Sequence, residues 1–405
     1  MKVAAIISEY NPFHNGHKYQ IDKLREILGE DTAVIAIMSG NYTQRGEIAI
    51  TDKTIRAKAA VECGINLVLE LPFPFSMSSA EFFAKSGVHI AESIGVVDYL
   101  VFGSECGNID ELSNIASTVT SPEYQLELDT LMSEPANRDL GYPTLCEMAL
   151  TRVYGKEAPI DLSLPNNILA IEYIKAISSE GSSILPLTIR REGCGYLDFI
   201  NPMAEFQSAS AIRGEIVANN VSAFNYVPYS AKEIYQKAIE EGKMPADPSM
   251  LDKAIISFFR INSPDAEVEI QDAKGGLYNR LCDKSAEATS ISSLTALAET
   301  KKYTHARIRR AIWNSYFGVT SSDVRELPLY TQVIAMDDIG RSLLKRIKKI
   351  SDFPVITKPS AYKELDGGVI RQKEISNKAD SVYGLTLKAP NSSTFALTFT
   401  PYVKK

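Results

Sequence analysis

The sequence contains no run of about 20 consecutive apolar residues, which is the length that a membrane-spanning helix requires. Its first residues read as a core strand rather than as a signal peptide. We therefore expect a cytoplasmic protein that has no membrane partner. Internal repeats and low-complexity segments are also lacking, which excludes an architecture of stacked repeats.

Cysteine is scarce and is not paired along the sequence. No two of the five cysteines form a C-x-x-C pair: Cys63, Cys106, Cys146, Cys194 and Cys282. This spacing indicates neither a zinc site nor a disulfide framework, so we expect reduced and mostly buried thiols. No cluster of carboxylates stands out as a metal site, and we predict no metal ligands among the side chains.

The overall charge is moderate. The 405 residues are 45% hydrophobic and 23% charged, and the formal net charge is −7. These values are typical of a folded protein with two or three domains. The negative net charge argues against indiscriminate binding to nucleic acids, and we expect no DNA partner.

The chain has only four histidines, and two of them lie in one turn near the N-terminus. The apolar run 3–7 predicts a buried strand, and apolar residues at helical spacing predict a helix over 18–28. Between them, His14 and His17 form an H-x-G-H motif in which Gly16 lets a ligand approach the backbone. Because the first N–H groups of a helix attract anions, this turn predicts a phosphate site. The alternative is that both histidines only cap the helix.

Strand and helix patterns alternate through the first half of the chain. Predicted strands cover 33–38, 66–71, 98–103 and 183–189, and predicted helices cover 52–63, 78–93 and 164–177, with further helices between 110 and 180. Short connections between these elements predict an α/β fold, a Rossmann-like parallel sheet with helices on both faces. Ligands of such sheets bind beyond the carboxyl ends of the strands. The loops 39–47, 72–75 and 103–105 follow strand ends, and we expect them to converge on the H-x-G-H turn.

Two later positions suit a nucleotide as well. Arg190 and Arg191 end the strand 183–189 ahead of a glycine-containing turn, and guanidinium groups bind phosphate in a fixed geometry. Asn166 opens the helix 164–177, where its simplest role is to cap the helix.

Taken together, these motifs resemble the H-x-G-H nucleotidyltransferase superfamily and, more specifically, the tRNA(Met) cytidine acetate ligase family. The resemblance rests on E-Y-N-P-F-H-N-G-H (9–17), S-G-N-Y-T-Q-R-G-E (39–47), E-L-P-F-P-F (70–75), V-F-G-S-E (101–105), L-P-N-N-I-L (164–169) and I-R-R-E-G-C-G-Y (189–196). It covers residues 1–215 clearly and the remainder in general layout.

The resemblance implies an ATP site in which His14 and His17 are catalytic. The implied ATP contacts are Ile7, Ser8, Glu9, Tyr10, Asn11, Pro12, Phe13, His14, Asn15, Gly16, His17, Lys18, Tyr19, Gln20, Gly103, Asn166 and Arg191. Superfamily members commonly hold the β- and γ-phosphates with an I-S-S-T-x-I-R element, which Ser208, Ser210 and Arg213 match and Ala209 does not. The alternative for this element is an ordinary serine cap. We expect Mg²⁺ to accompany the triphosphate.

The resemblance also implies a reaction. The family is understood to activate acetate with ATP as acetyl-adenylate and then to acetylate the wobble cytidine of elongator tRNA(Met), giving N4-acetylcytidine. We expect acetate and cytidine at the loop 39–52, with Asn41, Tyr42, Gln44 and Arg45 as candidates. The alternative is that Arg45 and Asp52 pair and only order the loop.

Positive charge is concentrated late in the chain. Residues 301–350 hold eleven Lys and Arg against four Asp and Glu, a local charge of +7 (11 − 4). Such a segment is most often a solvated helix face, but it can also contact an RNA backbone. Given the resemblance, we predict tRNA contacts at Arg307, Arg309, Arg310, Lys345, Arg346, Lys348 and Lys349.

We divide the chain into two domains. Residues 1–235 form the predicted catalytic domain, and residues 236–405 form a mainly helical, locally basic domain for tRNA binding. Helices are expected to dominate from 231 to 297, with others over 304–317 and 339–350, and strands are expected in the tail 381–403.

Two other functions remain open on the sequence. An adenylyltransferase or ligase for a small metabolite would account for residues 1–215 but not for the basic segment. A non-catalytic RNA-binding protein with a relict nucleotide site would have no reason to keep both imidazoles of the H-x-G-H motif.

Overall fold

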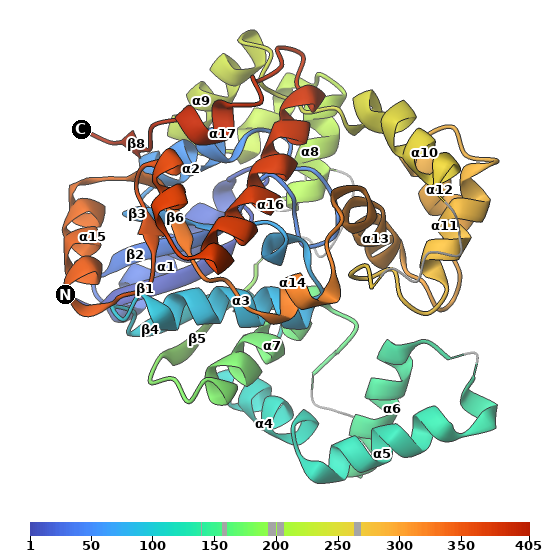
Figure 1. Cartoon of the computed structure of the whole chain (residues 1–405). Coiled ribbons are helices and arrows are strands. Elements are labelled where there is room, and N and C mark those ends of the chain that lie inside the picture. The colour runs from blue at the N-terminus through green and yellow to red at the C-terminus, as the bar shows by residue number, and fades with distance from the viewer. Residues whose placement is uncertain (139, 156–159, 193–199, 201–205, 263–268) are drawn as a thin grey trace.

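A mostly parallel sheet forms the centre of the protein (Figure 1). Five parallel strands lie in the order β5 (Leu185–Arg190), β4 (Tyr99–Ser104), β1 (Val3–Ser8), β2 (Ala33–Ser39) and β3 (Leu67–Leu71). Beside β3 runs the antiparallel β6 (Thr331–Met336), and the short strands β7 (Val355–Ile356) and β8 (Tyr402–Val403) pair with β6. The predicted α/β class is confirmed.

Both faces of the sheet are apolar because successive side chains of its central strands enter opposite cores. In β1, Val3 and Ala5 face one core, whereas Ala4 and Ile6 face the other. The first core is completed by α3 (Ala80–Ser93), α7 (Pro165–Ser179), α15 (Asp338–Ile350) and the helices between 109 and 154. The second is completed by α1 (Asn15–Leu28), α2 (Lys53–Glu62), α8 (Ala209–Val217) and α9 (Tyr229–Glu240).

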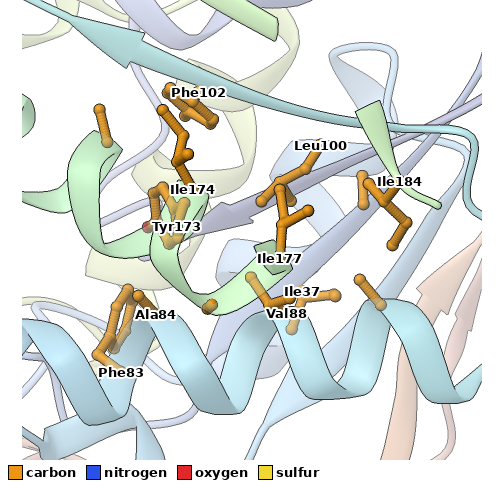
Figure 2. Close-up of a cluster of buried hydrophobic side chains, with 14 of the residues drawn as sticks. Ile37, Phe83, Ala84, Val88, Leu100, Phe102, Tyr173, Ile174, Ile177 and Ile184 are labelled. Carbon is orange, nitrogen blue, oxygen red and sulfur yellow. The ribbon is translucent and has the colours of Figure 1, made fainter. Parts of the chain in front are cut away.

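Dense packing fixes the helices against the sheet. Figure 2 shows Val88 of α3 and Ile177 of α7 packed together with Leu100 of β4 and Ile37 of β2. Burying side chains of this size contributes about 1.5–3 kcal/mol each. The strand ends that carry polar residues are therefore held on a rigid support.

The strand order determines where a ligand can bind. The chain leaves β1 toward β2 and β3 on one side, and later returns to β4 and β5 on the other side of β1. In doubly wound sheets this reversal opens a crevice at the carboxyl ends of the two central strands. The H-x-G-H turn follows β1 and Gly103 lies near the end of β4, so both are at this crevice.

Helices form the rest of the molecule. The middle of the chain contains α4 (Ile109–Val119), α5 (Pro122–Ser133) and α6 (Tyr142–Tyr154). The later part contains α10 (Asp252–Ile261), α11 (Leu277–Ser285), α12 (Ile291–Ala298), α13 (His305–Phe317), α14 (Ser321–Arg325), α16 (Gly367–Tyr383) and α17 (Phe395–Thr398). Helices α10 to α13 and α16 share a third core, to which the earlier part of the chain contributes Tyr42, Phe73 and Met77.

Three expectations about the second half need correction. The strand β6 is not among the predicted elements, and it joins residues 331–336 to the sheet of the first half. The proposed boundary at 235 therefore does not separate the sheet from the rest. In the tail, only Tyr402–Val403 form a strand. Residues 381–383 end α16, a 3-10 turn (Gly384–Thr386) and α17 follow, and the remaining residues of 381–403 have no regular structure.

The structure describes residues 1–138, 140–155, 160–192, 200, 206–262 and 269–405. Cys194 and the rest of the predicted turn 193–196 lie outside them. In the described part, Cys63, Cys106, Cys146 and Cys282 are free thiols. No helix in the same part is both long enough and apolar enough to cross a membrane.

Candidate functional site

The two histidines of the H-x-G-H turn cap α1. The Nδ1 atom of His14 accepts the backbone N–H of Gly16 at 3.1 Å, and the Nδ1 atom of His17 accepts the backbone N–H of His14 at 3.2 Å. Their rings lie 3.9 Å apart between centroids. Tyr10, at the start of the turn, has a φ of +46°, a strained conformation that clusters at functional sites. The alternative interpretation, that both histidines cap the helix, is thus confirmed. The caps use only the Nδ1 atoms, so the Nε2 atom of each histidine can still interact with a ligand.

Both imidazoles are neutral. Burial lowers the pKa of His14 to about 3, and the positive charges of Arg191 and Arg213 act in the same direction. Burial also lowers the pKa of His17 well below its ordinary value, helped by His14 and Arg191. Because each Nδ1 accepts a hydrogen bond, the ring proton is on Nε2. The turn therefore offers two neutral N–H donors.

A narrow cleft, partly open to solvent, lies at this turn. It is lined by His14, Gly16, His17, Tyr19, Gln20, Gly103, Ile189, Arg190, Arg191, Glu192, Phe206 and Gln207. Seven of the residues predicted to contact ATP, from three separate segments of the chain, meet here. A cleft with convergent polar groups at the switch point of an α/β sheet is the expected position for a nucleotide.

Gly103 has a structural task beside the predicted one. A Cβ atom at this position would lie 3.1 Å from Cγ of Arg191. Because Gly103 has no side chain, the side chain of Arg191 can extend over the end of β4. In this position Arg191 lines the cleft. The two residues act as a pair.

Asn166 is held by a residue that sequence reasoning missed. Its side-chain amide donates to Oε1 of Glu105 at 2.6 Å, and Oε2 of Glu105 accepts the backbone N–H of Asn167 at 2.7 Å. Glu105, rather than Asn166, therefore caps the start of α7. Its position after β4 in the motif V-F-G-S-E is the signal that could have identified it.

The serine-rich start of α8 forms as predicted. Ser208 accepts the backbone N–H of Ala211 at 3.0 Å, and the hydroxyls of Ser208 and Ser210 lie 3.2 Å apart. Arg213 donates to the backbone oxygen of Asn11 at 2.9 Å, next to the H-x-G-H turn. The cap is real, and the same geometry places Arg213 beside the H-x-G-H turn, where its charge acts on His14.

The loop 39–52, termed here the acceptor loop, is buried at its start. Asn41 donates to Asp380 at 3.0 Å and accepts the backbone N–H of Lys53 at 2.8 Å. Tyr42 is fully buried, and its hydroxyl donates to the backbone oxygen of Ala379. Its ring packs among other aromatic rings and is not open for stacking on a base. Of the four candidates, only Gln44 and Arg45 are partly exposed.

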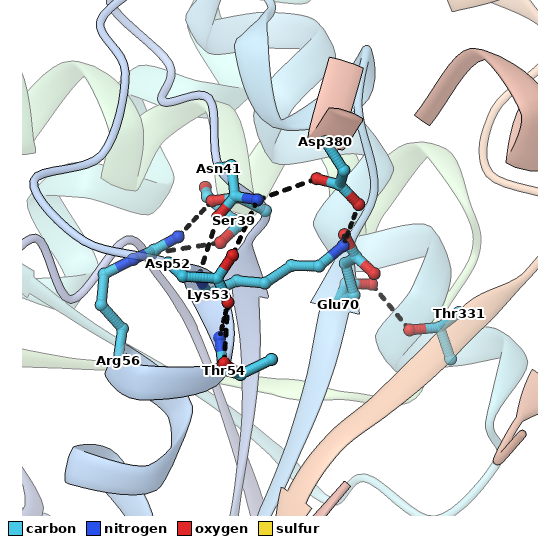
Figure 3. Close-up of polar contacts among 10 residues, drawn as sticks. Ser39, Asn41, Asp52, Lys53, Thr54, Arg56, Glu70, Thr331 and Asp380 are labelled. Carbon is cyan, nitrogen blue, oxygen red and sulfur yellow. Dashed lines mark hydrogen bonds and ion pairs between the residues drawn. The ribbon is translucent and has the colours of Figure 1, made fainter. Parts of the chain in front are cut away.

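A buried polar network supports this loop (Figure 3). Lys53 contacts Glu70 at 2.5 Å and Asp380 at 2.6 Å, and these two carboxylates raise the pKa of Lys53 although burial alone would lower it. Arg56, also buried, donates to the backbone oxygens of Ser39 and Thr51. Asp52 caps α2 by accepting the N–H of Thr54 at 2.8 Å. Residues far apart in sequence thus fix the loop at its base.

The predicted tRNA residues fall into two groups. The first group is on α15. This helix contacts Asn66, just before β3, at its start and Gly95, before β4, at its end. It therefore lies at the amino ends of the strands, whereas the cleft lies at their carboxyl ends (Figure 1). Its basic side chains are exposed: Lys345, Arg346, Lys348 and Lys349. Two arginines of α13, Arg309 and Arg310, instead lie beside the acceptor loop. The third, Arg307, donates to the backbone oxygens of Asp272 and Lys274. Among them Arg310 is buried against Asp272, which corrects the expectation of an open basic face there.

The described residues contain no group of three or more metal-ligating side chains. We therefore assign no protein ligand to the expected Mg²⁺ and derive no step through it.

Comparison with known proteins connects this geometry to a family. A family model for the HIGH Nucleotidyl Transferase matches residues 1–396. A tRNA(Met) cytidine acetate ligase of Thermoanaerobacter sp. (strain X514) is 36% identical over 404 residues, which are 98% of each chain. The chain belongs to the tRNA(Met) cytidine acetate ligase family. A second member, from Acetivibrio thermocellus, is 35% identical over 404 residues, or 96% of each chain.

Solved structures extend the likeness to the whole fold of the family. Thermotoga maritima TmcAL bound with alpha-thio ATP has a TM-score of 0.90 and 29% sequence identity, and the match covers 100% of this chain and 99% of that one. The apo form of the same protein has a TM-score of 0.92. The family resemblance and the fold expected from the sequence are both confirmed.

Proposed function

We propose that the protein is an ATP-dependent ligase that activates acetate as acetyl-adenylate and acetylates the wobble cytidine of elongator tRNA(Met). Membership of the ligase family supports the reaction and the substrates. The observation that carries the proposal is the H-x-G-H turn, where two neutral Nε2–H donors, the start of α1 and Arg191 meet in one cleft. The reaction is proposed to take place in the cytoplasm, with neither membrane nor DNA as a partner.

In the first step, an oxygen of acetate attacks the α-phosphorus of ATP. The new bond joins that oxygen to phosphorus, the bond to the bridging oxygen breaks, and pyrophosphate leaves. Negative charge accumulates on the phosphate oxygens during this displacement, so fixed donors aimed at them lower the barrier. We assign His14 and His17 this role. We assign Arg191, Ser208, Ser210 and Arg213 to the β- and γ-phosphates, because guanidinium groups and helix starts bind such anions.

In the second step, the exocyclic amine of cytidine attacks the acetyl carbonyl. A carbon–nitrogen bond forms, the bond between the acetyl carbon and the AMP oxygen breaks, and the amine loses a proton. The cytidine must leave its stack to reach the carbonyl. We assign Gln44 and Arg45 to this side of the cleft, and Asn41 and Tyr42 to the support of the loop.

Nucleoside mass spectrometry tests the proposal. Unmodified elongator tRNA(Met) is incubated with the protein, ATP and acetate, and the digested nucleosides are analysed. We expect N4-acetylcytidine only when both small molecules are present, and a loss of about 100-fold or more in His17→Ala. Formation of AMP and pyrophosphate without acetylcytidine would show that the acceptor is a different molecule, and absence of both reactions would overturn the proposal.

A separate binding measurement distinguishes a catalytic from a binding defect. His14→Ala should retain the tRNA affinity of the wild type while losing turnover, because the turn contacts the nucleotide and not the RNA. An RNA-binding protein with a relict site would show no change in any activity on this substitution.

A further inference from the structure

Three successive backbone oxygens in the acceptor loop accept hydrogen bonds from side chains of α13. The oxygen of Gln44 accepts from Nη1 of Arg310 at 3.4 Å, that of Arg45 from Nε of Arg309 at 3.2 Å, and that of Gly46 from Nε1 of Trp313 at 3.1 Å. Side chains of one helix that bind consecutive carbonyl groups fix the course of the backbone.

The helix and the loop are also in direct backbone contact. Gly46 has a φ of +74°, and a Cβ atom there would lie 2.7 Å from both Cβ of Arg309 and the backbone nitrogen of Arg310. Only glycine combines this conformation with so close an approach. The tip of the loop, residues 44–47, therefore takes its shape from α13.

The donors on α13 are themselves held. Arg310 forms a two-point ion pair with Asp272, with Nε–Oδ2 at 3.0 Å and Nη2–Oδ1 at 3.1 Å, and both side chains are only 9% exposed. Trp313 is buried against Tyr42, with ring centroids 5.4 Å apart. A guanidinium that is neutralised and buried in this way is poorly placed to bind an RNA phosphate, and well placed to orient a loop.

The same loop tip also contacts two residues beside the H-x-G-H turn. The backbone N–H of Gln44 donates to Oε1 of Glu9 at 2.9 Å, and Glu9 follows β1 directly. Glu47 contacts Arg213 at 3.0 Å with one carboxylate oxygen and Arg309 at 3.2 Å with the other. The loop tip thus spans the space between α13 and the phosphate-binding residues.

We propose that α13 positions the tip of the acceptor loop against the nucleotide site, with Arg310 and Trp313 as positioning residues for acetyl transfer. This inference rests on the proposed function, in which the loop tip faces the cytidine. Transfer needs the amine and the carbonyl in a defined geometry, and a displacement of about 1 Å can cost as much as a hundredfold in rate. Activation of acetate takes place at the H-x-G-H turn, which α13 does not contact through these bonds.

Two conservative variants test the proposal. Trp313→Phe keeps an aromatic ring and removes the N–H donor, and Arg310→Lys keeps the charge and removes the two-point pair. Matched controls are Tyr316→Phe, on the same helix, and Arg325→Lys, on the exposed face of α14. Thermal unfolding of all four variants shows which of them fold as the wild type does.

Three quantities are compared: the rate of acetylcytidine formation in a single turnover, the amount of AMP formed per acetylcytidine, and the affinity for tRNA at several salt concentrations. In both test variants we expect transfer to slow about tenfold. Water then cleaves the acetyl-adenylate that is not transferred, giving acetate and AMP, so AMP per acetylcytidine should rise above the wild-type ratio. The affinity for tRNA and its salt dependence should stay within about twofold, and both controls should behave as the wild type.

The opposite pattern would overturn the proposal. In that case the variants would bind tRNA more weakly, the salt dependence of binding would fall by about one phosphate contact, and AMP per acetylcytidine would not change. This result would show that the residues contact RNA. Unchanged transfer in both folded variants would also overturn it. A wild-type protein that forms AMP but no acetylcytidine would instead refute the proposed function itself, before any variant is compared.

Discussion

Substitution of Lys53 by methionine should destabilise the protein strongly. The side chain is only 3% exposed and contacts two buried carboxylates, at 2.5 Å in Glu70 and at 2.6 Å in Asp380. Methionine fills most of the same volume but carries no charge. The variant therefore keeps two carboxylates in the protein interior, where the buried Lys373 also interacts with both of them.

The magnitude follows from this arrangement. Removing one member of a buried ion pair costs about 3–5 kcal/mol, because the charge that remains is neither paired nor hydrated. Lys373 offsets part of the loss, since its interactions with Glu70 and Asp380 oppose the effect of burial, which lowers its pKa to about 8. We therefore expect a loss of about 3 kcal/mol in the free energy of unfolding. This loss is large compared with the free energy of unfolding of a typical domain, which is about 5–15 kcal/mol.

Urea unfolding measures this loss. Trp313 is the only tryptophan and is buried in the core that Tyr42 joins, so its fluorescence reports on the region, and far-UV circular dichroism reports on the whole chain. The control is Lys237→Met, because Lys237 is 71% exposed and lies 3.7 Å from Glu241; its loss should stay below about 0.5 kcal/mol. A loss below about 1 kcal/mol in Lys53→Met would refute the reasoning.

Three further predictions concern the site. Burial lowers the pKa of His14 to about 3, so below about pH 6.5 the unfolded chain binds a proton that the folded chain does not. The free energy of unfolding should therefore fall as the pH drops from 6.5 toward 3. Acid unfolding curves should show a weaker pH dependence for His14→Gln. Arg56→Lys loses donors to the oxygens of Ser39 and Thr51 and should lower the free energy of unfolding by about 2–4 kcal/mol, whereas a change below about 1 kcal/mol would contradict the network. Glu105→Gln loses the charge that orders Asn166 and should weaken ATP binding about three- to tenfold in calorimetry, with the partly exposed Glu134→Gln unchanged.

The sequence predicted the elements around the H-x-G-H turn for a local reason. The strand 3–7, the H-x-G-H turn and the following helix are neighbours in the chain, and their apolar spacing and turn residues determine them without distant contacts. Gly103 and Arg191 were predicted from strand ends, and the parallel order of the strands brings them to the same edge.

The acceptor side was predicted less well, because it depends on contacts between distant residues. From the sequence, the ring of Tyr42 is a candidate for stacking on a base. In the structure α13 and α16 cover this ring, and both helices lie more than 250 residues later in the chain. Arg310 reads as one of several surface cations, and only the fold brings Asp272 beside it. The strand β6 pairs with β3 across a similar separation, which periodicity cannot show.

Isotope transfer tests the central claim most directly. The protein is incubated with elongator tRNA(Met), ATP and acetate that carries ¹⁸O in both oxygens, and the AMP is analysed by mass spectrometry. If an acetate oxygen attacks the α-phosphorus and the acetyl group then moves to cytidine, each AMP formed carries one ¹⁸O atom and each acetylcytidine carries the other. AMP without ¹⁸O beside labelled acetylcytidine would contradict the acetyl-adenylate route.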